Sequence, residues 1–290
     1  MTADADIRLL TIDDLDGAFA LSSTAGWNQQ LDDWRMLLRI APAGSFAALA
    51  EGRIVGTAIG IDYGSFGWIA MMLVDPAYRA RGIGARLLEA AMAALPPDRP
   101  IRLDATPLGR PLYQRYGFED ETTLSRRVAD PRDRHVLPVS GLQPLTSADL
   151  AIITKEDRTV FGGNRSAVLE WTHARAPEYA WGMRTDSGVV QYCLGRPGRL
   201  FDHVGPVVAR DHDIATALVS AAVRAAGDRP IVIDAFDSRK TFSGWLGDNG
   251  FQVQRPLFRM SRPGRARQSA VEDTIRPPLF EFAILGPEFA

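Results

Sequence analysis

Residues 72–90 read MLVDPAYRARGIGARLLEA, and the interpretation of the whole chain starts from this stretch. An apolar run ends at Val74, a proline turn follows, and an Ala/Leu-rich helix is expected from Gly84. A helix N-terminus leaves up to four backbone N–H groups without partners and carries partial positive charge. Glycines let a ligand approach the backbone, and arginines add charge-assisted hydrogen bonds. The stretch fits a phosphate site; surface arginines beside a glycine-shaped turn are the alternative.

Two other glycine-rich phosphate motifs fit this stretch poorly. The chain contains no Gly-x-x-x-x-Gly-Lys-Ser/Thr, which excludes a nucleotide-hydrolysing loop. A dinucleotide-binding loop needs three glycines after the first strand of a parallel unit. Here the preceding strand is the third of a predicted meander, and only Gly82 and Gly84 are present. The sequence therefore disfavours a Rossmann-type site.

Length and composition indicate a globular protein with two domains. The chain has 290 residues, with 46% hydrophobic and 23% charged residues. Its net charge of -2 gives no indication of a nucleic-acid partner, and its single cysteine excludes an intramolecular disulfide. No apolar run reaches the ~20 residues of a membrane helix, and the acidic N-terminus does not resemble a signal peptide. We expect a cytoplasmic protein without a membrane partner.

The order of predicted elements occurs twice along the chain, which indicates an internal repeat. Each copy reads strand, two helices, three strands, helix, strand, helix, strand. The first copy has predicted strands at 7–10, 45–50, 53–64, 66–74, 101–105 and 122–128, and helices at 11–23, 31–40, 84–95 and 110–117. The second has strands at 139–145, 180–185, 188–195, 199–209, 231–236 and 255–260, and helices at 147–161, 164–175, 213–227 and 240–251. We predict domains at 1–130 and 139–264, a linker at 131–138, and a tail at 265–290 that belongs to neither copy.

Two motifs of the first copy resemble the GNAT N-acetyltransferases. RARGIG (79–84) is similar to the family's pyrophosphate motif, Arg/Gln-x-x-Gly-x-Gly/Ala, and RPLYQRYGFE (110–119) to its second signature, a short helix with a tyrosine that ends in Gly-Phe. The element order of residues 7–128 is also similar to the whole GNAT fold. The resemblance implies an α/β (α+β) fold class: two tandem GNAT-like domains, each with a mixed, mainly antiparallel sheet flanked by helices. It implies acetyl-CoA, or another acyl-CoA, as co-substrate and no metal.

The resemblance also implies which residues contact the cofactor. In the family, the strand before the motif pairs with the pantetheine arm, and the loop and first helical turn bind the pyrophosphate through backbone N–H groups. On this sequence the implied cofactor-binding residues are Met72, Leu73, Val74, Arg79, Ala80, Arg81, Gly82, Ile83, Gly84 and Ala85.

By the same resemblance, Tyr113 is the acid that protonates the departing CoA thiolate; a packed helical tyrosine is the alternative. The amine would attack the thioester directly, with strand N–H groups stabilising the oxyanion. The sequence does not identify a general base. The nominal candidates are Glu51, Asp62 and Asp104. Thr106 stands where many relatives have asparagine, which bears on the acceptor side of the site.

Residues 24–34 correspond to the region where the acceptor usually enters, and Trp27, Asn28 and Asp32 are the candidate acceptor-binding residues. An aromatic ring and a carboxylate could bind a cationic amine of a small molecule or peptide. Core tryptophans beside an acidic helix start are the alternative. A homo-oligomer remains open.

The second copy lacks the features that imply catalysis. Leu246 stands at the position of Tyr113, and RDHDIATALV (210–219) has no glycine where the first copy has its Arg/Gly loop. We therefore expect one acetyl-CoA-dependent N-acetyltransferase domain followed by a non-catalytic partner. The alternative is a non-enzymatic protein that binds acyl-CoA or regulates another process.

Overall fold

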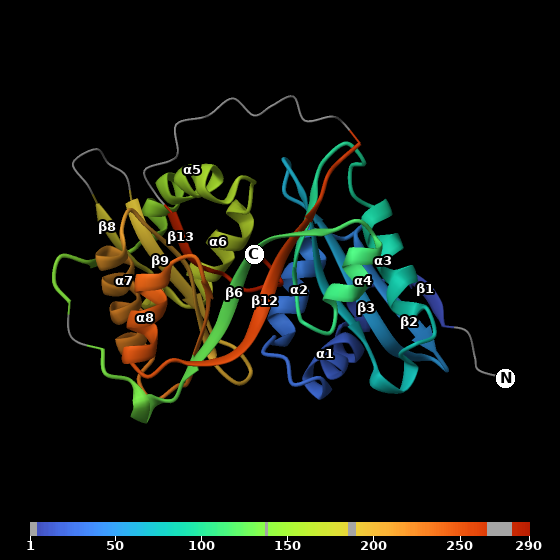
Figure 1. Cartoon of the computed structure of the whole chain (residues 1–290), viewed down its shortest axis with the longest axis horizontal. Coiled ribbons are helices and arrows are strands. Elements are labelled where there is room, and N and C mark those ends of the chain that lie inside the picture. Colours follow the sequence, from blue (N-terminus) through green and yellow to red (C-terminus); the bar gives the residue numbers. More distant parts are fainter. Residues whose placement is uncertain (1–4, 137–138, 185–189, 266–279) are drawn as a thin grey trace. The chain divides into compact units, whose positions relative to one another are not determined.

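The structure is a computed structural model and describes residues 5–136, 139–184, 190–265 and 280–290. They form eight α-helices and thirteen β-strands (Figure 1). The chain divides into two compact units, each of which takes segments from both repeats. Unit 1 comprises Met1–Leu103, Pro111–Glu119 and Ser261–Arg267, and unit 2 comprises Asp104–Arg110, Asp120–Met260 and Gln268–Ala290.

Unit 1 has a five-stranded sheet in the order β1-β2-β3-β4-β5. The first four strands are antiparallel, and β5 runs parallel to β4. The strands are β1 (Asp6–Leu9), β2 (Ser45–Ala50), β3 (Arg53–Asp62), β4 (Gly67–Val74) and β5 (Ile101–Ala105). The helices are α1 (Leu15–Thr24), α2 (Leu31–Ile40), α3 (Ile83–Ala93) and α4 (Arg110–Arg115), with short 3-10 turns at Ile12–Asp14 and Pro76–Tyr78.

Two glycines of β3 allow α3 to pack closely on the sheet. A Cβ atom at Gly56 would lie 2.8 Å from Leu87 Cδ1, and one at Gly60 would lie 2.5 Å from the Ala91 carbonyl oxygen. The face of α3 that meets them is apolar and fully buried at Leu87 and Ala91. These close contacts fix the start of α3, and with it the Arg/Gly loop, at the end of β4.

Unit 2 has a mixed sheet in the order β12-β6-β11-β13-β10-β9-β8-β7. Its strands are β6 (Glu119–Ala129), β7 (Gln143–Pro144), β8 (Trp181–Arg184), β9 (Val190–Arg196), β10 (Asp202–Ala209), β11 (Ile231–Phe236), β12 (Gln252–Arg262) and β13 (Phe280–Ile284). The helices are α5 (Leu150–Phe161), α6 (Ser166–Arg175), α7 (His212–Ala225) and α8 (Lys240–Asp248), with 3-10 turns at Pro131–Asp133, Ser147–Asp149 and Pro177–Tyr179.

The sheet of unit 2 is buried on both faces. Along β9, Cys193 points into the core formed with α7 and α8, whereas its neighbours Tyr192 and Leu194 point into the core formed with α5 and α6. This alternation is the period of two expected for a strand with a helical layer on each side.

Two features of unit 2 go beyond the predicted order of elements. The last strand of the first repeat, β6, pairs antiparallel with β11 of the second repeat, from Leu124–Phe236 to Ala129–Ile231. Figure 1 shows β6 beside β12, the last strand of the second repeat. The stretch after Gly264, which was predicted to belong to neither copy, contributes β13 to the middle of this sheet. The first two residues of the predicted strand 188–195 lie outside the described residues.

Candidate functional site

The predicted phosphate loop forms the N-terminus of α3 in unit 1. Gly82 is the N-cap residue, with φ at +78°, and Ala80 two residues earlier is also left-handed, with φ at +60°. Left-handed residues in a loop turn successive N–H groups toward one side and can create a concave site for an anion. The first turn of α3 adds its unpaired N–H groups and the positive end of the helix dipole.

The two arginines of the motif fasten this loop to the preceding turn. Arg79 donates from Nε to the Val74 carbonyl oxygen at 3.1 Å, and Arg81 donates from Nη2 to the Ala77 carbonyl oxygen at 2.8 Å. The Arg81 guanidinium also lies 4.9 Å from the centre of the Tyr78 ring. Both arginines remain exposed, so they keep positive charge at the rim of the loop while they hold its shape.

Strand β4 carries a β-bulge just before this loop. Leu73 pairs with Thr57 but Ala70 pairs with Ile59, so Met71 and Met72 together oppose one residue of β3. Met71 has φ at +51°, an uncommon conformation for a residue with a side chain, and the Thr57 hydroxyl donates to its carbonyl oxygen at 2.8 Å. A bulge redirects the N–H groups of its strand, and backbone strain of this kind concentrates at functional sites.

Helix α4 brings Tyr113 into the same unit. The neighbouring Leu112 and Val74 both lie close to Gly84, with side-chain carbons 3.7 Å and 3.6 Å from where a Cβ on that glycine would be. Tyr113 is only 7% exposed, and its ring packs edge-on against Phe118 with centroids 6.0 Å apart. Burial raises the pKa of Tyr113 above its ordinary value, so the phenol keeps its proton. The structure thus places a buried, protonated hydroxyl on α4, and the neighbouring Leu112 lies close to the first turn of α3.

Two of the three nominal bases are engaged in ion pairs. Asp62 accepts two hydrogen bonds from Arg99, at 2.7 Å and 2.9 Å, and Asp104 accepts two from Arg259, both at 2.9 Å. Glu51 is an exposed turn residue with φ at +52°. Both aspartate carboxylates are therefore occupied by arginine side chains.

The candidate acceptor-binding residues lie before and at the start of α2. Trp27 is half-buried and Asn28 is 5% exposed, whereas Asp32 is exposed and pairs with Arg35 at 2.7 Å. Gln29, which no sequence motif indicates, is 6% exposed, and its side-chain oxygen has no hydrogen-bond partner among the described residues. A buried amide oxygen without a partner is unusual and fits a donor from a ligand.

The second copy differs from the first at three matching positions of this site. Helix α7 begins with Asp211, whose carboxylate accepts from the Ile214 N–H at 3.0 Å, where α3 begins with Gly82. Aligning the parallel pairs of the two units places Pro206, which has no N–H, at the position of Met71. Leu246 of α8 is fully buried at the position of Tyr113. The carboxylate at the helix start repels the phosphate groups of a ligand, and the proline removes a backbone N–H donor from the strand.

The described titratable groups outside this loop do not meet the requirements of a metal site. Among the residues that the structure describes, no three His, Cys, Asp or Glu side chains are grouped so as to hold a metal ion. His203 is buried 3.6 Å from the Asp234 carboxylate, and its pKa is lowered to about 3, mainly because of burial.

Among the residues that the structure describes, no helix is both long and apolar enough to cross a membrane.

Comparison with known protein families gives two matches along the chain. The Acetyltransferase (GNAT) domain matches residues 42–120, and a second model with the same description matches residues 153–274. The chain belongs to the GNAT acetyltransferases. It carries two GNAT domains in tandem, as the two motifs and the repeated element order predict, and the predicted fold class is confirmed.

Two bacterial relatives share this assignment. An uncharacterized N-acetyltransferase of Bacillus subtilis, YitH, is 26% identical over 193 residues, which are 65% of this chain and 67% of that protein. An uncharacterized N-acetyltransferase of Escherichia coli, YafP, is 28% identical over 99 residues, 34% of this chain and 60% of that protein.

Solved structures show the same fold over nearly the full length. A putative acetyltransferase from Pyrococcus horikoshii has a TM-score of 0.75 and 23% identity, covering 98% of this chain and 95% of that one. A tandem GNAT protein from the clavulanic acid biosynthesis pathway has a TM-score of 0.61 and 16% identity, covering 89% of this chain and 98% of that one.

Proposed function

We propose that unit 1 binds acetyl-CoA and transfers its acetyl group to an amine, and that unit 2 does not catalyse. The contrast between the two helix N-termini carries this proposal. Helix α3 starts at a left-handed glycine after an exposed Arg79 and Arg81, whereas α7 starts at Asp211 with its carboxylate on the helix N–H groups. Only the first arrangement attracts a diphosphate.

The residues of unit 1 suit the other parts of an acyl-CoA as well. The backbone of Arg79–Ala85 and the two guanidinium groups would hold the phosphates, and the end of β4, Met72–Val74, would pair with the pantetheine amides. When bound, acetyl-CoA supplies the acetyl group as a thioester. N–H groups at the Met71 bulge would stabilise negative charge on the carbonyl oxygen, because preorganised backbone donors need no rearrangement.

Tyr113 would supply the proton to the departing sulfur. Its burial keeps the phenol neutral, and the neighbouring Leu112 lies close to Gly84 in the first turn of α3. Asp62 and Asp104 are each engaged with an arginine, so a water chain is the route that we propose for the amine proton.

The acceptor that we propose is an amine of a small molecule or peptide. The segment before α2 offers an aromatic ring at Trp27, a buried amide at Asn28 and the unpartnered oxygen of Gln29. An ammonium or amine N–H group would satisfy that oxygen. Asp32 adds negative charge at the surface, although it is shared with Arg35.

Calorimetric titration with acetyl-CoA tests the proposal. The wild type should bind one equivalent, and Gly82→Val should lose binding, because a β-branched residue opposes φ at +78° in the phosphate loop. Gly52→Val is the matched control: Gly52 has φ at +73° and, as at Gly82, no atom lies within 4 Å of where a Cβ would be. The control should lose stability by a similar amount but keep acetyl-CoA affinity.

Transfer is then followed by release of the CoA thiol with a panel of amines. If Gly82→Val binds acetyl-CoA as tightly as Gly52→Val does, the proposed cofactor site is wrong. Binding without transfer to any amine would leave an acyl-CoA-binding protein instead of an enzyme.

A further inference from the structure

Strands β4 and β10 are counterparts, and this relation locates a second site in unit 2. Each strand precedes the long helix of its repeat. Each also pairs in parallel with the following strand through its first two residues only, Gly67 and Trp68 in β4 and Asp202 and His203 in β10. Counting from these pairs, Val207–Ala209 of β10 correspond to Met72–Val74 of β4.

Strand β13 lies along this part of β10. Val207 pairs with Ala283, Val208 with Glu281 and Ala209 with Phe280, all antiparallel. On its other edge β13 pairs with β11, through Asp234–Ile284 and Ala235–Ala283. The parallel strands β10 and β11 therefore separate after two residues, and β13 completes the hydrogen bonding of both.

We propose that the split between β10 and β11 is a peptide-binding slot, which holds residues 280–290 of the same chain in the position where unit 1 takes the arm of an acyl-CoA. The comparison with unit 1 rests on the proposed function; the slot itself rests on the strand pairing. An extended peptide and a pantetheine arm present similar amide groups to a strand edge, and addition of a strand is a common mode of peptide recognition.

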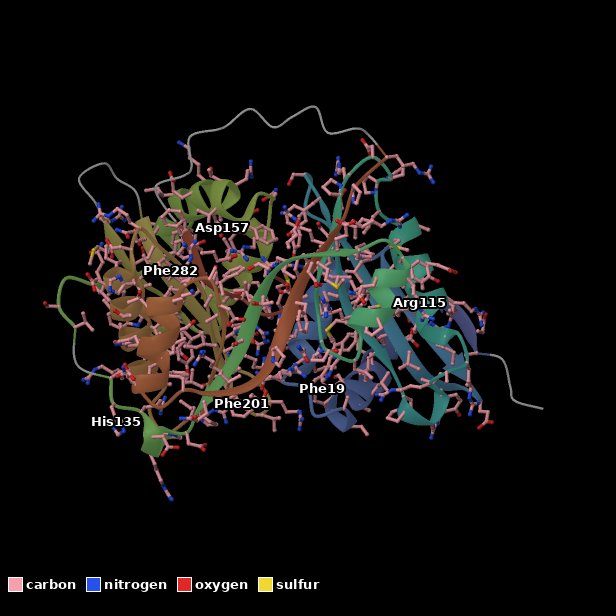
Figure 2. All side chains as sticks on the ribbon, in the orientation of Figure 1. Phe19, Arg115, His135, Asp157, Phe201 and Phe282 are labelled. Carbon is pink, nitrogen blue, oxygen red and sulfur yellow. The ribbon has the colours of Figure 1, made fainter. Side chains whose placement is uncertain are left out.

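A buried network of ion pairs contacts the start of the segment formed by residues 280–290. Arg165 of α6's N-terminal cap is fully buried and donates to Glu281 Oε1 at 2.8 Å. The same guanidinium donates to Asp157 at 2.8 Å and 3.0 Å and contacts the Ala290 carbonyl oxygen. Figure 2 shows Asp157 on α5 and Phe282 on β13 within unit 2. A buried arginine that spans two acids and the chain backbone fixes one register of the segment.

The end of the segment has a second set of contacts. Arg196 of β9 forms a buried ion pair with Glu288, and the Phe289 ring lies 5.5 Å from the Trp171 ring, between centroids. A Cβ at Gly205 would clash with the Ile284 carbonyl oxygen, so only glycine at this position allows β13 to pack this closely against β10. Phe289 and Ala290 are completely buried.

These contacts define the class of ligand. The slot takes an extended segment with apolar residues at Phe282, Ala283 and Ile284, which are at most 5% exposed, and with acidic residues near its two ends. Its arginines, Arg165 and Arg196, are both buried and form ion pairs with the two acidic residues, Glu281 and Glu288. Because the chain fills this slot itself, the full-length protein should bind one acyl-CoA and not two.

Cleavage of the folded full-length chain tests the slot. A recognition sequence for a site-specific protease is inserted after Arg267, the protein is cut, and the products are separated by size exclusion and weighed by mass spectrometry. The C-terminal fragment should stay with the rest of the protein in native buffer and leave in denaturant. A labelled synthetic peptide of residues 280–290 should then rebind when the denaturant is removed.

Variants of one glutamate test the register. Glu281→Gln keeps the shape and a hydrogen bond to Arg165 but removes the charge, and Glu281→Arg places two guanidinium groups together. The peptide with arginine should bind roughly a hundredfold more weakly than the wild-type peptide, since it brings a second positive charge into a buried site beside Arg165. Glu170→Arg, an exposed glutamate on α6, is the matched control in the cut protein and should change nothing.

Titration of the uncut protein with acetyl-CoA separates this proposal from the proposed function. A retained fragment with one equivalent of acetyl-CoA supports both. A retained fragment without any acetyl-CoA binding supports the slot and overturns the function of unit 1. The proposal of a peptide-binding slot is overturned if the fragment is released in native buffer without loss of thermal stability. It is also overturned if the uncut protein binds two equivalents of acetyl-CoA.

Discussion

Arg259 holds Asp104 with two parallel hydrogen bonds, Nε to Oδ1 and Nη2 to Oδ2, both of 2.9 Å. Arg126 holds Asp234 in the same way, with two contacts of 2.7 Å. The two arginines each stand nine residues after the glycine that ends the preceding helix, Gly117 or Gly250, and each aspartate is the fourth residue of its strand. The two ion pairs are therefore equivalent in the two repeats.

Each of these pairs joins residues of different repeats. The arginine of the second repeat binds the aspartate of the first, and the reverse holds for Arg126 and Asp234. The pairing of β6 with β11 follows the same exchange. The first repeat thus supplies its last strand, β6, to the sheet of unit 2, where it pairs with a strand of the second repeat.

Arg259→Met should destabilise the protein strongly. The change leaves Asp104, whose side chain is fully buried, without its partner, and the free energy of unfolding should fall by about 3–5 kcal/mol. Urea unfolding followed by tryptophan fluorescence measures it. Arg35→Met, which breaks the half-exposed pair with Asp32, should cost less than about 1 kcal/mol. Equal losses for the two variants would contradict the structural role of Arg259, and adding Asp104→Asn to Arg259→Met should recover part of the loss.

Tyr113→Phe should slow acetyl transfer by roughly a hundredfold or more and leave acetyl-CoA affinity unchanged, because the variant removes only the proton donor. Tyr116→Phe is the control, since the Tyr116 hydroxyl donates to Glu89 at 2.6 Å on the outside of unit 1. Burial raises the pKa of Tyr113, so its proton is lost only at a pH above the ordinary tyrosine value of about 10. A decline in the wild-type rate below pH 10 that disappears in Tyr113→Phe would be inconsistent with this assignment.

Thr57→Val should weaken catalysis through the bulge of β4. The Thr57 hydroxyl is fully buried and donates to the Met71 carbonyl oxygen, so its loss should reduce stability by about 1 kcal/mol and the transfer rate by roughly tenfold or more. Thr172→Val removes an equivalent buried bond, from its hydroxyl to the Val168 carbonyl oxygen at 2.8 Å, in unit 2. That variant should lose similar stability and no activity. Equal transfer rates in the two variants would remove the bulge from the mechanism.

His203 should make the protein less stable as the pH falls from about 6.5 to about 3. Its pKa in the folded state is lowered to about 3, chiefly by burial, with Arg196 and Arg126 acting in the same direction and Asp234 against it. The unfolded chain takes up the proton first, at a pKa near 6.5, so the free energy of unfolding falls by up to about 1.4 kcal/mol per pH unit.

The interval from pH 6 to pH 4.5 isolates this effect, because ordinary carboxylates stay mostly charged there. His203→Gln should flatten the slope of stability against pH in this interval. The exposed His212→Gln should not. A slope unchanged by His203→Gln would mean that the unfolded and folded states hold that proton alike.

The sequence alone predicts the elements of the fold well, because helices and strands are encoded by local patterns. The helix at 31–40, the strand at 101–105 and the strand at 231–236 match the structure residue for residue. The Arg/Gly loop is equally local, since glycine, arginine and helix start are adjacent in the chain.

The sequence gives no indication of the bulge at Met71 or of the unpartnered Gln29 oxygen. A methionine with positive φ has no residue signature, unlike the left-handed Gly82, and only the register of β3 against β4 shows it. Pro206 is visible in the sequence, but only the alignment of the strands shows that it occupies the position of Met71.

What the sequence by itself determined is the set of elements, their repetition and the motif that places this chain in its family. What only the tertiary structure decided is which strands become neighbours. Strand β6 pairs with β11, and β13 enters between β10 and β11, although β13 lies far along the chain from both. The physical reason is that a strand's hydrogen-bonding edge accepts any extended segment of suitable length. Which segment becomes the neighbour depends on side chains that are distant in the sequence. Here these are the arginines that form ion pairs with Asp104, Asp234, Glu281 and Glu288.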